Sequence, residues 1–113
     1  MAKRKKRRER EPPAIADYTD AEGNVLTLRE SLSAASLEKI SRERGKAGAT
    51  AEDAYRRREE MLFERLVVSW EVAGLPLDDQ AMLLSRYRMA DAREREWVRR
   101  TIAEHVERHL PGL

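Results

Sequence analysis

Cysteine is absent from this chain of 113 residues, which excludes disulfides, thiol catalysis and the common zinc ribbons. No apolar run reaches the roughly 18 residues that a transmembrane helix needs. The basic N-terminus is followed by Glu9, Glu11, Pro12 and Pro13, where a secretory signal would have its apolar stretch. We therefore expect a soluble, cytoplasmic protein that does not enter a membrane.

Aromatic residues are also scarce, at 5% of the sequence, whereas charged residues make up 39%. The average charged fraction is roughly 25%, and such an excess argues against a β-sandwich or a rigid enzyme scaffold. It favours helices with solvated faces. The length fits one domain. The composition thus predicts a mainly α fold, with about four helices in a single domain over residues 14–113.

Charge is distributed unevenly along the chain. The net charge is +2, yet the first ten residues hold seven cations against one acid, so the remainder is acidic overall. The cations are Lys3, Arg4, Lys5, Lys6, Arg7, Arg8 and Arg10. Mutual repulsion without apolar partners predicts a disordered tail over residues 1–13. Two interpretations of this tail stay open: a weak, salt-sensitive contact with nucleic acid or another polyanion, and an arm that only aids solubility.

Two short β-prone runs flank a turn that contains Asp20, Gly23 and Asn24. This pattern predicts a β-hairpin over residues 15–28, with Gly23 or Asn24 at positive φ. A lone hairpin is marginal in water, so it must dock on helices or on another chain. After the hairpin, Ser33, or Thr27 with an acid three residues later, can cap the first helix.

Helical spacing and capping signals place the rest of the chain in helices. The four predicted helices span residues 33–44, 51–73, 78–89 and 92–109. Thr50 and Asp53 resemble a capping box, Gly74 supplies a left-handed helix stop, and Asp91 with Glu94 forms a second capping pair. The predicted core consists of Leu62, Leu66, Trp70, Met82, Tyr87, Val98, Ile102 and Val106.

The only histidines, His105 and His109, are one helical turn apart, which is the spacing of two imidazoles on one metal. No third ligand is evident, and core packing near a helix C-terminus explains them better. Asp78, Asp79 and Asp91 stand where helix N-caps are needed and have no nucleophile or base beside them. We expect no catalytic residue, no metal and no cofactor, and hence not an enzyme.

Large and adaptable apolar side chains exceed what a small core needs, which favours some apolar surface for a partner, although an ordinary core explains any single methionine. The predicted partner-binding residues are Trp70, Leu75, Pro76, Met82, Met89 and Trp97. The sequence does not decide whether the chain forms a homo-oligomer.

The stretch from Leu66 to Leu77, with Trp70, Gly74 and Pro76, resembles the tail assembly chaperones of long-tailed phages and prophages. In those proteins a Trp-containing helix end precedes a Gly-x-Pro turn, and the run 23–29 is similar to their short β-like opening. The resemblance implies a non-enzymatic protein of the host cytoplasm that binds a helical tape-measure protein and keeps it soluble during tail assembly. Some members are also made as a longer frameshifted product, and this chain would correspond to the short form. The alternative is a nucleic-acid-binding accessory protein that uses residues 3–10.

Overall fold

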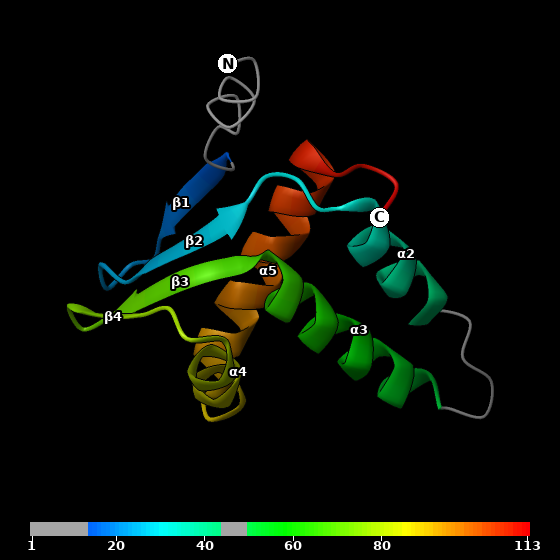
Figure 1. Cartoon of the computed structure of the whole chain (residues 1–113). Coiled ribbons are helices and arrows are strands. Elements are labelled where there is room, and N and C mark those ends of the chain that lie inside the picture. The colour runs from blue at the N-terminus through cyan, green and yellow to red at the C-terminus, as the bar shows by residue number, and fades with distance from the viewer. Residues whose placement is uncertain (1–13, 44–49) are drawn as a thin grey trace, which may run out of the picture.

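The structure, a computed structural model, describes residues 14–43 and 50–113 (Figure 1). The predicted basic tail therefore lies outside the described residues. The elements in chain order are β1 (Ile15–Thr19), β2 (Val25–Arg29), α2 (Ala34–Glu43), α3 (Ala51–Leu66), β3 (Val67–Val72), β4 (Leu75–Leu77), α4 (Gln80–Arg88) and α5 (Ala92–His109).

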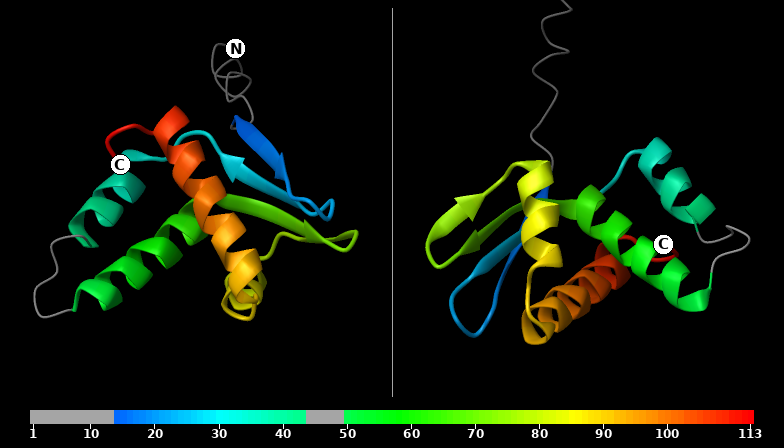
Figure 2. Two further views of the ribbon diagram at one scale, coloured as in Figure 1. Left: turned by 180° about the vertical axis from the view of Figure 1, so that it is seen from behind. Right: turned by 90° about the horizontal axis from the view of Figure 1, so that it is seen from below.

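The strands form one antiparallel sheet in the order β1-β2-β3-β4. Leu26 lies between Tyr18 of β1 and Trp70 of β3, and Trp70 lies beside Leu77 of β4, so these four side chains share one face of the sheet. Helix α5 crosses that face, while α3 continues the line of β3 away from the sheet and α2 packs against α3 (Figures 1 and 2). The core lies between this face and helices α3, α4 and α5.

The prediction of a mainly α domain is wrong, because the described chain combines four helices with a four-stranded sheet. The error lies in the predicted helix 51–73, which ends at Leu66 and continues as β3. Helical spacing from Leu62 through Leu66 to Trp70 hid the change. The run Val67–Val72 contains three valines and a tryptophan, and β-branched and aromatic side chains suit a pleated, half-buried surface.

Gly74, predicted to end a helix, instead lies in the two-residue turn between β3 and β4. Ala73 and Gly74 have φ of 53° and 81°, and Val72 pairs with Leu75 across them. Positive φ at both central positions is typical of a hairpin turn whose twist matches the strands. The Ala73 N–H donates to Oδ1 of Asn24 (3.0 Å), which joins this turn to the β1–β2 turn.

The first hairpin and the capping signals agree with the sequence. β1 and β2 form the predicted hairpin, with Gly23 at φ 85°. Helix α5 covers the predicted range, and Asp91 and Glu94 form both bonds of a capping box. The Thr50 hydroxyl accepts from the Asp53 N–H at the start of α3 (3.0 Å).

The structure also shows which of the candidate N-cap residues begin α2 and α4. The Ser33 hydroxyl accepts from the Ser36 N–H (3.2 Å) where α2 begins, whereas Thr27 lies inside β2 and donates to Asp17 (2.7 Å). The cap of α4 is Asp79, which accepts from the Met82 N–H (3.1 Å).

Most of the predicted core is buried or packed against the buried cluster, but Met82 is not. Its exposed fraction is 55%, because α4 turns Leu83 and Tyr87 toward the sheet and Met82 lies on another side of the helix. The predicted core was therefore right at Tyr87 and wrong at Met82. Other buried positions that it did not include are Leu26, Leu28, Ile40, Phe63, Val67, Leu83 and His105.

Candidate protein-binding surface

Three of the predicted partner-binding residues are large apolar side chains left exposed on two consecutive elements of the chain. Leu75 begins β4 and is 70% exposed, and Met82 on α4 and Met89 at the C-cap of that helix are 55% and 78% exposed. Only Asp78 and Asp79 separate β4 from α4, so strand and helix are adjacent elements (Figures 1 and 2). We call Leu75, Met82 and Met89 the β4–α4 surface.

Helix α4 explains why both methionines face solvent. They are seven residues apart, close to two helical turns, and so lie along one side of the helix. The buried residues of the helix, Leu83 and Tyr87, lie on another side. The fold therefore uses one apolar side of α4 and leaves a second one uncovered. Large apolar side chains left in water by the fold are candidates for contact with a partner protein.

The remaining predicted partner residues occupy different positions. Pro76 is exposed on β4, opposite Glu71 of β3. Trp97 is half-buried against the core. Trp70 is only 2% exposed, and the Arg86 guanidinium of α4 lies 5.1 Å from the centre of its ring. This cation–π contact helps to hold α4 on the sheet, so Trp70 stabilises the position of α4 and is not itself part of the exposed surface.

An ion pair and a hydrogen bond join α4 to α3. Arg88 contacts Glu60 of α3 (2.7 Å), and this bond holds the pKa of Glu60 below its ordinary value. The Tyr87 hydroxyl donates to Glu59 of α3. Burial first, and then this bond, raise the pKa of Tyr87 above its ordinary range. These contacts hold α4 against α3, with Met82 facing solvent.

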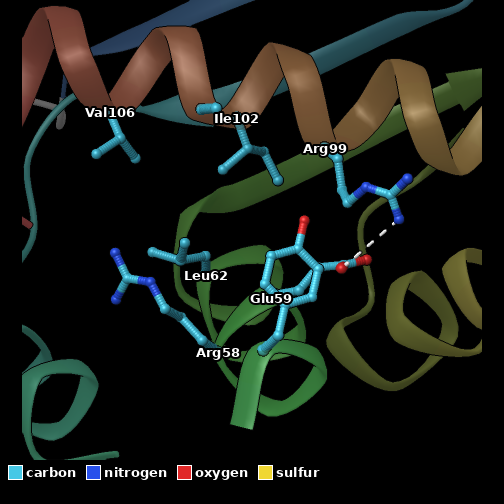
Figure 3. A pocket seen from close by; sticks show the side chains of 8 residues that line it. Arg58, Glu59, Leu62, Arg99, Ile102 and Val106 are labelled. Atoms are coloured by element: carbon cyan, nitrogen blue, oxygen red, sulfur yellow. Dashed lines mark ion pairs between the residues drawn. The ribbon is translucent and has the colours of Figure 1, made fainter. Parts of the chain in front are cut away.

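Apart from the β4–α4 surface, a cleft with a volume of about 270 Å³ lies between α3 and α5. Figure 3 shows Ile102 and Val106 of α5 and Leu62 of α3 around an apolar centre, with the ion pair between Glu59 and Arg99 at its edge (3.7 Å). The lining is completed by Tyr55, Arg58 and Ala103. The space suits one apolar side chain. Sequence reasoning missed this cleft, because it depends on the angle at which two helices distant in sequence diverge.

His105, considered in the sequence as a metal ligand, is fully buried between the sheet and α5. Its Nε2 lies 2.7 Å from the Arg29 carbonyl and its Nδ1 lies 2.7 Å from the Tyr18 hydroxyl. A carbonyl only accepts, so Nε2 donates to it, and in the neutral imidazole that burial favours Nδ1 accepts from the tyrosine hydroxyl. Burial lowers the pKa of His105 below its ordinary value. Both nitrogens are used in joining β1, β2 and α5.

His109 lies next to His105, with ring centres 4.7 Å apart. In residues 14–43 and 50–113 no three His, Asp or Glu side chains gather as a metal site would require. The two histidines thus form a packed pair at the end of α5 near the sheet.

No protein-family model, curated protein or solved structure matches this chain. Among the described residues, no helix combines the length and the apolar character needed to cross a bilayer. The stretch from Leu66 to Leu77 that resembles tail assembly chaperones is a strand, a tight turn and a short strand, and not a helix end followed by a turn.

Proposed function

We propose that this protein is a non-enzymatic assembly chaperone or adaptor that holds a helical partner in solution in the bacterial cytoplasm. The partner we propose is a tape-measure-type protein of a phage tail. The observation that carries the proposal is the exposure of Leu75, Met82 and Met89 together on β4 and α4. The choice of partner rests on the sequence resemblance of residues 66–77 to tail assembly chaperones alone, since residues 67–77 form β3, a tight turn and β4 rather than a helix end and a turn.

Energetics favour a covered state for this surface. Full burial of one Leu or Met side chain is worth about 1.5–3 kcal/mol relative to leaving it in water. A partner helix that lays its apolar side on α4 gains this free energy from both chains. Methionine suits such a contact, because its flexible thioether adapts to different side chains. The mode is that of an amphipathic helix packed along an apolar surface.

Co-expression with the tape-measure-type protein tests the proposal. We expect the partner to stay in the soluble fraction with the native chain and to precipitate with a variant that carries Leu75→Ser, Met82→Ser and Met89→Ser. Ile15→Ser is the matched control, because Ile15 is a half-exposed apolar residue on β1, the opposite edge strand of the sheet. A partner that stays equally soluble without this chain would overturn the proposal.

A further inference from the structure

The β4–α4 surface lies in a part of the chain with an unusual charge. Lys and Arg account for 23 of the 113 residues, yet none occurs from Leu66 to Ser85. The acids in this run are Glu71, Asp78 and Asp79. Glu71 faces the opposite side of the sheet from Leu75, whereas the two aspartates connect β4 to α4. Leu75 and Met82 therefore have carboxylates as their only charged neighbours within that run, whereas Met89 lies beyond the run and directly follows Arg88.

The cations nearest in sequence do not neutralise these carboxylates. Arg86 contacts Glu94 (2.7 Å) and stacks on Trp70, and Arg88 contacts Glu60 (2.7 Å). Within residues 14–43 and 50–113, Asp78 has no ion pair and its side chain is exposed. Asp79 is the N-cap of α4, where the helix dipole offsets part of its charge. Asp79 places a carboxylate oxygen 3.1 Å from the Met82 backbone nitrogen, and the exposed Asp78 directly precedes it in the chain, so both carboxylates stand at the start of α4.

We infer that the β4–α4 surface selects a cationic amphipathic helix, whose apolar stripe covers Leu75, Met82 and Met89 and whose Lys or Arg side chains pair with Asp78 and Asp79. This inference rests on the proposed function and adds the chemistry of the partner segment. Charge complementarity of this kind raises association rates and rejects segments of the wrong sign. A second copy of the chain in a twofold dimer is a poorer occupant, because residues 66–85 of that copy offer no Lys or Arg to pair with Asp78 and Asp79.

Two synthetic helical peptides with one apolar stripe, flanked by Lys in one and by Glu in the other, test the inference. We expect the full chain to bind the Lys peptide more tightly in fluorescence anisotropy at low salt. Asp78→Asn should weaken that complex about two- to fivefold, as for one exposed ion pair. Asp78→Lys should favour the Glu peptide instead. Glu104→Gln, an exposed carboxylate on α5, is the control and should change neither affinity.

Each contrary outcome has a distinct meaning. Equal affinities for the two peptides, or no binding of either, overturn the inferred charge selection. If Met82→Ser still abolishes solubilisation of the partner in co-expression, the proposed function survives that result. A chain lacking residues 1–11 that binds the Lys peptide several-fold more tightly would identify its own basic segment as the occupant and would also overturn the inference.

Discussion

Helices α4 and α5 pack against the same face of the sheet but divide their apolar residues differently. Helix α5 turns Val98, Ile102 and His105 into the protein. Helix α4 buries Leu83 and Tyr87 and leaves Met82 and Met89 in water. The fold does not require the methionines, whereas it depends on the residues that both helices bury. This contrast separates residues that stabilise the domain from residues that are free to recognise a partner.

The largest effect is expected at Trp70, which anchors α4 from the core. Trp70→Ala should cost about 3–5 kcal/mol in the free energy of unfolding, enough to unfold a marginal domain. Trp70→Phe should cost less, because the indole Nε1 makes no hydrogen bond with the described residues. Chemical denaturation of both variants measures the difference. A denaturation midpoint for Trp70→Ala equal to that of the native chain would contradict the structural role of Trp70.

Met82 and Leu83 are neighbours on α4, and substitutions at these two positions should have opposite effects on stability and on partner binding. Leu83→Ala should cost roughly 2–5 kcal/mol of stability, because it leaves a cavity in the core. Met82→Ala should change stability by no more than about 0.5 kcal/mol, as expected for an exposed site, yet reduce solubilisation of the partner. Thermal denaturation and co-expression measure the two effects. Comparable losses of stability at both positions would contradict the assignment of Met82 to a binding surface.

The next effect concerns His105, through the pH dependence of stability. Its pKa is lower in the folded protein than the ordinary value of 6.5, so the unfolded chain binds more protons at mildly acidic pH. The contribution of His105 to stability is therefore complete above about pH 6.5 and is lost as the pH falls through the folded pKa. Its size is about 1.4 kcal/mol for each pH unit by which the folded pKa lies below the ordinary value.

Urea midpoints between pH 5 and pH 8 measure this dependence. His109→Gln is the control, since it removes the neighbouring ring, leaves His105 in place and should keep the loss of stability in acid. A midpoint that rose on acidification between pH 6.5 and pH 5 would contradict a neutral, buried His105.

The smallest effect on partner binding is expected from the basic segment. Deleting residues 1–11 should leave partner solubilisation intact, because the residues proposed to contact the partner, Leu75, Met82 and Met89, all lie outside that segment. If residues 3–10 instead carry the function, affinity for duplex DNA should fall with salt at a logarithmic slope of roughly −4 to −6. Filter binding across salt concentrations distinguishes the two. Loss of partner solubilisation in a correctly folded deletion variant would favour the segment over the helical body.

Local signals predicted the helices better than the sheet. Asp91 with Glu94 and Thr50 with Asp53 identified two helix starts, because a cap depends only on its own turn. The strand β3 escaped prediction, because its pairing partner β2 lies about 40 residues away along the chain and the Leu62–Leu66–Trp70 spacing fits a helix equally well.

The candidate surface followed a similar pattern. Residue type alone indicated Leu75, Met82 and Met89, but their joint exposure depends on which side of α4 meets the sheet. The cleft between α3 and α5 depends on how two helices diverge, which no local pattern encodes.

The bond between Asn24 and Ala73 has a consequence for the kinetics of recognition. Asp20 holds Asn24 through two further contacts (2.9 and 3.0 Å), so the two hairpin turns are braced as one unit beside Leu75. A braced strand has little freedom left to lose when a partner arrives. We therefore expect related partner helices to dock at similar rates and to differ mainly in how long each complex lasts.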